Sequence, residues 1–311
     1  MISGIWKNIF SVEDADFSHK LIRILGFRFR IIKSEIKNSN VIDYLQFDNV
    51  SQIPKAGGFL RLYQLGLLEI LKEFDRVCTI NNVKYWLSGG TLLGAKRHGG
   101  FIPWDDDVDV DMMRDDFENF AQTFNNSTNN PDLYCEIYQD KNAPATYILK
   151  IKHRKIRQIF LDIFPHDFYI KSVQGFEKKF LNFQIRAVRK FMSFMPFKIP
   201  RARILFFTKF FINNNIKPNE KNKPSIHWGL EFPHRWSNWI YDYDQIFPLQ
   251  KIKFEGYEFW VPNDTDFMLR NIYGDYMKLP NKIYPHHTDE KLFTKDEMDE
   301  LLKLGGNCAE A

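Results

Sequence analysis

The chain has 311 residues, of which 44% are hydrophobic, and this composition is typical of a globular protein rather than a disordered one. Its three cysteines, Cys78, Cys135 and Cys308, form no CxxC pair, which argues against a disulfide framework or a zinc knuckle. The sequence contains no long apolar run, and its first residues do not resemble a signal peptide, so we expect a cytoplasmic protein. The formal net charge of +4 is small but unevenly distributed.

Residues 60–81 are the first clear element of the sequence. Apolar side chains recur there at spacings of three, four and seven residues, which predicts an amphipathic helix with one face against a core. This apolar stripe consists of Leu60, Leu67, Leu68, Leu71, Phe74 and Cys78.

The stretch VKYWLSGGTLLGAKRHGG follows this helix. It predicts a short strand at 83–87, a tight turn at Ser88, Gly89 and Gly90, and a helix beginning near Thr91. Glycines let a backbone approach a ligand closely, and the exposed amides of a helix N-terminus favour an anion such as phosphate. These four residues are therefore candidates for substrate binding, although Gly-Gly pairs also occur in ordinary strand-to-helix turns.

Five aspartates crowd into residues 105–111. A strand over 107–112 would alternate its side chains, so that its apolar residues point into the sheet and its aspartates share the opposite face. The apolar set is Val108, Val110 and Met112, and the acidic set is Asp107, Asp109 and Asp111. Like charges on one face repel, and a divalent cation would offset this repulsion. We expect Mg²⁺, with Mn²⁺ as the alternative ion; a solvated acidic turn is the other interpretation.

Asp162 is a further candidate acid. It stands in the apolar run QIFLDIFPHDFY at 158–169, where an unpaired carboxylate would be costly. It can complete a metal triad, or it can be a helix cap or the partner of a salt bridge.

Most of the positive charge lies in residues 171–223. This segment contains thirteen Lys or Arg against two acids, with apolar residues between the cations at helical spacings. We expect a basic amphipathic helical insertion. Such a segment can rest on an anionic membrane surface or simply present a solvated basic face.

Three blocks of the sequence resemble the LicD family of phosphotransferases, within the nucleotidyltransferase-fold superfamily. They are YWLSGGTLLGAKRHGGFIPWDDDVDVDMMRDDF at 85–117, LDIFPHDFY at 161–169 and KFEGYEFWVPNDTDFMLRNIYGDYMKLP at 253–280. Fukutin-related glycan phosphotransferases share the first block more distantly. The resemblance implies an α/β (α+β) fold, a nucleotidyltransferase-like mixed sheet flanked by helices. It also suggests four parts: a variable segment 1–59, a catalytic core 60–170, the basic insertion 171–223 and a C-terminal part 224–311.

The resemblance also implies an activity and roles for particular residues. The family transfers a substituted phosphate, commonly phosphocholine from CDP-choline, to a hydroxyl of a cell-surface glycan such as lipopolysaccharide, teichoic acid or capsule. By motif position, Asp107 and Asp109 would bind Mg²⁺, with Asp105 assisting, and Asp162 would be the third acid. Asp111 departs from the family pattern, which usually has a small residue there. Met113 likewise replaces a common proline.

Other candidates rest on the residue types alone. Arg97 and Arg114 can neutralise a phosphate, or each can form a salt bridge. His286 and His287 can contact substrate or transfer protons, and exposed spectators are an equal interpretation. Two alternatives to the transferase are a catalytically silent scaffold that binds glycan or membrane and a metal-dependent phosphohydrolase. Nucleic acid is not an expected partner, because the basic segment carries no recognised binding motif.

Overall fold

The computed structural model describes residues 10–14, 19–24, 27–32, 50, 53–139, 147–169, 223–229, 240–279 and 288–306. The predicted basic insertion lies outside these residues except for Lys223, and so do His286 and His287. Within the part that the structure describes, no helix is both long enough and apolar enough to cross a bilayer.

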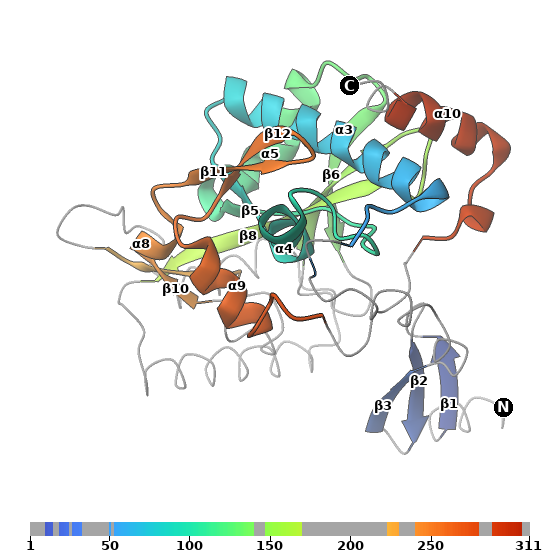
Figure 1. Ribbon diagram of the computed structural model, residues 1–311, viewed down its shortest axis with the longest axis horizontal. Helices are drawn as coiled ribbons and strands as arrows, with labels where there is room; N and C mark the ends of the chain where they lie inside the picture. The colour runs from blue at the N-terminus through green and yellow to red at the C-terminus, as the bar shows by residue number, and fades with distance from the viewer. Residues whose placement is uncertain are drawn as a thin grey trace, which may run out of the picture.

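A mixed seven-stranded sheet forms the centre of the molecule (Figure 1). Its main path contains, in order, β10 (Ile240–Asp242), β9 (Ser225–Trp228), β8 (Phe160–Tyr169), β5 (Asp109–Met113) and β4 (Tyr85–Leu87). The remaining two strands are β6 (Leu133–Gln139) and β7 (Tyr147–His153), and β7 pairs with β8. Strand β8 is parallel to β5 on one edge and antiparallel to β7 and β9 on the other. The expected mixed α/β sheet is thus confirmed.

Helices α3 (Gly58–Ile80) and α5 (Arg114–Ser127) contact the sheet and each other. Their apolar faces meet the apolar side chains of the central strands. Val108, Val110 and Met112 are fully buried, as the alternation predicts. The amphipathic helix predicted over 60–81 is confirmed, with every predicted stripe residue except the half-buried Leu60 inside the core.

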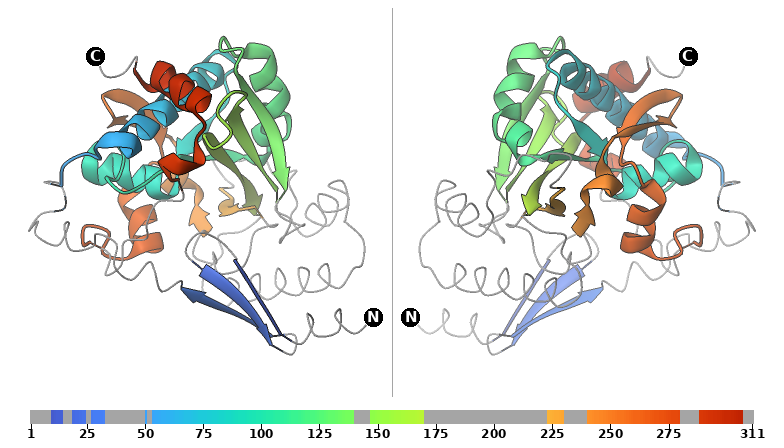
Figure 2. Two further views of the ribbon diagram at one scale, coloured as in Figure 1. Left: turned by 90° about the vertical axis from the view of Figure 1, so that its right-hand side faces the viewer. Right: turned by 90° about the vertical axis from the view of Figure 1, so that its left-hand side faces the viewer.

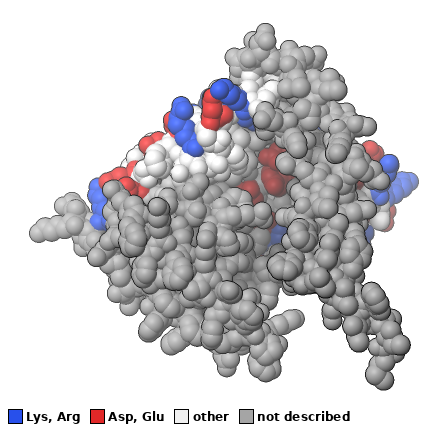
Figure 3. All heavy atoms as spheres, turned by 90° about the horizontal axis from the view of Figure 1, so that it is seen from below, with Lys and Arg blue, Asp and Glu red and all other residues white. Residues whose placement is uncertain are grey.

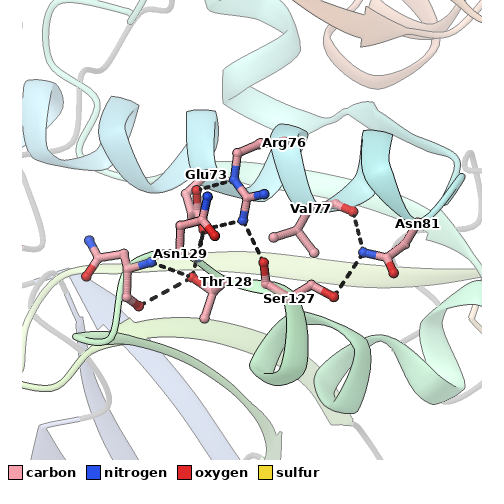
Figure 4. A network of polar contacts seen from close by, with 8 residues as sticks. Glu73, Arg76, Val77, Asn81, Ser127, Thr128 and Asn129 are labelled. Atoms are coloured by element: carbon pink, nitrogen blue, oxygen red, sulfur yellow. Dashed lines mark hydrogen bonds and ion pairs between the residues drawn. The ribbon is translucent and has the colours of Figure 1, made fainter.

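Polar contacts fasten the C-terminal end of α5 to α3 (Figure 4). Arg76 donates a hydrogen bond of 2.6 Å to the Ser127 carbonyl, and Asn81 Nδ2 donates one of 3.2 Å to Ser127 Oγ. Glu73 accepts from Thr128 Oγ1 at 2.8 Å and from the Asn129 amide at 2.6 Å. The polar loop after α5 is therefore held against the helix that precedes the site.

The C-terminal elements surround the end of the sheet where β4 stops and β5 begins. The hairpin of β11 (Gln250–Phe254) and β12 (Tyr257–Val261) lies against β4, and α4 (Gly89–His98) lies against β5, β11 and α9 (Thr265–Tyr273) (Figures 1 and 2). The other described elements are α8 (Tyr243–Ile246), the 3₁₀ helix η4 (Glu290–Leu292), α10 (Lys295–Gly306) and a separate antiparallel sheet of β1 (Phe10–Asp14), β2 (His19–Ile24) and β3 (Phe27–Ile32).

Two predicted boundaries were wrong. The helix after the glycine turn begins at Gly89 rather than near Thr91, because Ser88 already has the extended backbone of an N-cap residue. The acidic strand begins at Asp109 rather than at residue 107, so Asp105 and Asp107 lie in the loop before it. The Asp162 amide nevertheless bonds to the Val108 carbonyl at 2.9 Å, which fixes the end of this loop to β8.

Helix α10 crosses α3 at two glycines. A Cβ on Gly305 would lie 2.8 Å from the Leu62 carbonyl oxygen and 3.2 Å from the Gly66 amide nitrogen, both backbone atoms. The two helices can therefore pack at this distance only without a side chain at residue 305.

We predict that Gly305→Ala destabilises the protein by about 1–3 kcal/mol, because the added methyl group must push the two helix backbones apart. Thermal unfolding measures this change. Gly306→Ala is the matched control, since nothing lies within 4 Å of a Cβ at that position. Equal unfolding temperatures for the two variants would contradict the close crossing of α3 and α10.

Candidate functional site

The N-terminus of α4 is bonded directly to β5. The Ser88 amide donates to the Asp109 carbonyl at 3.0 Å, and the Asp109 amide donates to Thr91 Oγ1 at 2.9 Å. The Ser88 hydroxyl donates to Asp111 Oδ2 at 2.7 Å. The helix start and the acidic strand therefore form one rigid unit.

Gly89 and Gly90 allow two carboxylates to lie against the first turn of α4. Gly89 has a φ of +51°, and a Cβ there would be 2.7 Å from Asp109 Oδ2. A Cβ on Gly90 would be 2.5 Å from Asp105 Oδ2. The sequence predicts a close approach at this turn, and the groups that approach it in the structure are the chain's own carboxylates. The N-terminal end of a helix dipole favours such negative charge.

The parallel register of β5 and β8 brings Asp162 to the same place. Asp109 and Asp162 are directly paired residues of the two strands, so their side chains leave the same face of the sheet. Asp162 therefore lies beside the acidic strand, and its role as the third acid of a metal triad stays a prediction. Acidic side chains are visible in a hollow near the middle of the lower face (Figure 3).

These carboxylates repel each other. Burial and the charges of Asp107 and Asp106 raise the pKa of Asp105 well above its usual range. Burial, followed by the charges of Asp107 and Asp162, does the same to the pKa of Asp109. Carboxylates perturbed in this way indicate a position where a cation would be favourable.

Lys150 on β7 is the direct partner of Asp162. Its ammonium donates to Asp162 Oδ1 at 2.6 Å and to Oδ2 at 2.9 Å. Burial raises the pKa of Asp162, and the Lys150 charge acts against this rise.

The acidic loop is held from behind by α3 and from the C-terminal side. The buried Gln64 donates from Nε2 to the Asp105 carbonyl at 2.9 Å and to the Ile102 carbonyl at 3.2 Å. The buried Asp106 accepts a hydrogen bond of 2.7 Å from the Thr288 amide. Asp106 therefore has an anchoring role, whereas Asp105 and Asp107 line the site.

Glu255, in the tight turn between β11 and β12, holds the start of the same loop. Its carboxylate accepts from Arg61 at 2.7 and 3.0 Å, from Lys55 at 2.7 Å and from the Phe101 amide at 3.1 Å. A Cβ on Gly100 would overlap the Glu255 carboxylate. The hairpin and α3 thus fix the loop that carries the aspartates.

Arg97 lies beside the site and contacts the segment that follows α9. It is buried, donates to the Tyr276 carbonyl at 2.9 Å, and burial lowers its pKa to about 10. Burial and the charges of Asp109 and Asp105 raise the pKa of Tyr273 on α9. Arg97 as a phosphate ligand stays a prediction.

Arg114 forms a bidentate ion pair with the fully buried Asp167, at 2.9 Å and 2.6 Å. It also donates to the Tyr147 hydroxyl at 3.0 Å. The salt-bridge interpretation of Arg114 therefore describes the structure, although the pair lies in the core and not on the surface. Because Arg114 is buried and paired with Asp167, we do not propose it as a phosphate ligand.

Asp111 and Met113, the two residues that depart from the family pattern, are both buried. Asp111 is fully buried and accepts hydrogen bonds from the Ser88 hydroxyl and from Trp86 Nε1, the latter at 3.2 Å. Burial raises the pKa of Asp111 to about 8, and the hydrogen bonds from Ser88 and Trp86 act against this rise. Met113 packs in the core at the junction of β5 and α5.

The donor set suits a hard divalent cation. Asp105, Asp107, Asp109 and Asp162 offer only carboxylate oxygens, the ligands that Mg²⁺ prefers. Among the described residues, no group of three or more His, Cys, Asp or Glu side chains is arranged to hold a metal ion. Mg²⁺ is usually held by one or two carboxylates, with water and substrate phosphates as the other ligands, and Asp107 and Asp109 fit this smaller role.

Comparison with known proteins agrees with this geometry. Residues 82–197 match the model of the LicD/FKTN/FKRP nucleotidyltransferase domain. The chain is 31% identical over 263 residues to the lipopolysaccharide cholinephosphotransferase LicD of Haemophilus influenzae, a match that covers 74% of this chain and 97% of that protein. It is 58% identical over 59 residues to the ribitol 5-phosphate transferase FKRP of Homo sapiens, covering 18% of this chain and 12% of that one. Mannosyltransferase regulator 4 of Saccharomyces cerevisiae matches over 65 residues, at 35% identity, covering 21% of this chain and 6% of that protein.

The sheet, the carboxylate cluster and these matches define a transferase of phosphate-containing groups. The chain belongs to the LicD family.

Three residues of the site were not singled out by the sequence analysis. Lys150, Gln64 and Glu255 act through partners 12, 41 and 154 residues away along the chain. One available signal was the pair of adjacent polar and glycine residues at Glu255 and Gly256, which is typical of a tight turn. No local pattern distinguished Lys150 from its neighbours.

We predict that Gly89→Ala reduces transferase activity by roughly a hundredfold, because its methyl group would displace the Asp109 carboxylate. Gly99→Ala is the matched control. Gly99 also has a positive φ, of +65°, but nothing lies within 4 Å of a Cβ there. Both variants carry the same kind of backbone strain, so a comparable loss of activity in Gly99→Ala would contradict the role of the close approach. Steady-state kinetics with a thermal unfolding control measures both effects.

Proposed function

We propose that this chain is a Mg²⁺-dependent phosphotransferase that moves phosphocholine from CDP-choline to a hydroxyl of a cell-surface glycan. Mn²⁺ is an alternative ion. The observation that carries this proposal is the placement of Asp109 and Asp105 against the glycine turn of α4, with Asp162 on the adjacent strand. Carboxylates and helix amides at one point can hold a metal and a phosphate together.

Asp107 and Asp109 would hold the metal, with Asp105 assisting. The metal, when bound, offsets charge on the diphosphate and on the leaving CMP. The amides that follow Ser88 at Gly89 and Gly90 would bind a phosphate oxygen, and Thr91 and Ser88 keep this turn in place on β5. The amides would stabilise the negative charge of the phosphate without rearrangement, because hydrogen bonds join the glycine turn to β5.

Asp162 would orient the acceptor hydroxyl. In the proposed step the hydroxyl oxygen attacks the phosphorus distal to cytidine, a new P–O bond forms, and the bond to CMP breaks. The hydroxyl proton passes to a carboxylate and then to solvent. Asp162 can alternatively bridge the metal, since it pairs with Asp109 in the sheet.

The choice of CDP-choline is supported by the Haemophilus relative, whose name gives it cholinephosphotransferase activity and of which this chain covers 97%. The human relative named as a ribitol 5-phosphate transferase matches only a short stretch. A CDP-alcohol is the common chemical class of both donors in this proposal. The acceptor would be a glycan or a lipid-linked glycan, and the basic segment 171–223 would let the protein rest peripherally on the inner face of a membrane.

Calorimetric titration tests the donor. CDP-choline, CDP-ribitol and CTP are titrated into the purified protein with Mg²⁺ and again with EDTA. We expect binding of CDP-choline that depends on metal and exceeds that of CTP. Selectivity for CDP-ribitol would change the donor, whereas equal binding in EDTA would overturn the metal dependence. Binding without transfer to any acceptor would favour the silent scaffold.

We predict that Asp109→Asn abolishes measurable transfer but leaves the fold intact. Without metal, the variant should be as stable as the wild type or slightly more stable, because one repelling charge is removed. Asp115→Asn is the control: it removes a carboxylate from the exposed first turn of α5. Normal turnover in Asp109→Asn would remove the metal-site hypothesis. Release of free phosphocholine by the wild type without acceptor would favour the phosphohydrolase.

A further inference from the structure

Lys150 is built into the carboxylate site. Its ammonium contacts both oxygens of Asp162, and only 9% of the Lys150 side chain and 18% of the Asp162 side chain are exposed. A lysine ammonium has three N–H donors, and Asp162 takes two of them. The geometry therefore leaves one donor for another oxygen.

The sheet register places this ammonium beside the cluster. Lys150 on β7 pairs with Asp162 on β8, and Asp162 pairs with Asp109 on β5. The three side chains are thus neighbours across three strands and leave the same face of the sheet. The cation is one strand away from the carboxylate that lies on the glycine turn.

Two aromatic rings hold the ammonium at this position. The Lys150 Nζ atom lies 3.6 Å from the centre of the Phe160 ring and 4.9 Å from the centre of the Tyr138 ring. Aromatic faces attract a cation through the charge distribution of the ring. The rings therefore keep the charge near the site while its N–H groups can change partners.

The two arginines that the sequence suggests as phosphate ligands are differently placed. Arg114 is engaged by Asp167, and Arg97 donates to the Tyr276 carbonyl. Neither forms an ion pair with a carboxylate of the site among the contacts of the described residues. Lys150 has such a pair, and a lysine on a flexible stem can turn from a carboxylate to a phosphate.

We infer that Lys150 is a donor-phosphate ligand of this site. Without donor it neutralises Asp162. When the diphosphate enters, its ammonium binds a phosphate oxygen, and Asp162 becomes available to the acceptor hydroxyl or the metal. This inference rests on the proposed function, because it requires a diphosphate donor.

The test compares Lys150→Met with Lys152→Met. Lys152 lies two residues further along β7 on the same face, and its ion pair is with Glu136, outside the cluster. Two titrations are made on each protein: Mn²⁺ alone, and CDP-choline in the presence of Mg²⁺. We expect Lys150→Met to weaken donor binding at least tenfold, since a charge-assisted contact is lost. Its Mn²⁺ affinity should rise severalfold, because Asp162 loses its neutralising partner. Lys152→Met should change neither affinity by more than about twofold.

The two opposite changes separate this role from a structural one. Donor affinity within twofold of the wild type would overturn the inference, and so would a parallel loss of Mn²⁺ and donor binding. Should Lys150→Met fail to fold, Lys150→Gln carries the same test, because an amide can still bond to Asp162 but has no charge. If the wild type itself binds no CDP-alcohol, the proposed function fails, and the Mn²⁺ titrations still report whether Lys150 neutralises the cluster.

Discussion

Repulsion among buried carboxylates is the constraint on which the functional end of this molecule depends. The negative charges of Asp105, Asp107, Asp109 and Asp162 act on one another, and burial makes these charges costly. Several features of the fold act against this cost. The positive end of α4 faces Asp105 and Asp109, and Lys150 pairs with Asp162. These groups neutralise the carboxylates only in part, so further positive charge at this site would be favourable.

The packing around the cluster prevents the carboxylates from separating. Gln64 and the Thr288 amide bond to the loop before β5, and Glu255 bonds to its first residues. Asp109 is fixed by its place in the strand and by Thr91. Phosphoryl transfer requires such fixed groups, because its catalysis depends on neutralising charge and aligning the reacting groups more than on covalent chemistry with the protein.

The sequence predicted those features whose cause is local. The helix over 60–81 follows from its apolar period. The mixed sheet was predicted from the family resemblance that the three motif blocks carry. The start of β5 was misplaced because alternation of Asp and Val continues through residues 107 and 108, whereas pairing with β4 begins only where Leu87 meets Val110. Asp111 and Arg114 are buried with the hydrogen-bonding partners Trp86 and Asp167, respectively. No local sequence pattern identifies these partners.

The contacts of Glu255 with residues far earlier in the chain can form only late in synthesis. The acidic loop and α3 are synthesised long before the β11–β12 turn, yet Lys55, Arg61 and the Phe101 amide all converge on the Glu255 carboxylate. Until residue 255 has left the ribosome, these basic groups and the loop lack their common acceptor. A nascent or truncated chain that ends before this turn therefore contains every aspartate of the cluster but lacks the carboxylate that holds the acidic loop against α3, so the last fifth of the polypeptide supplies this contact.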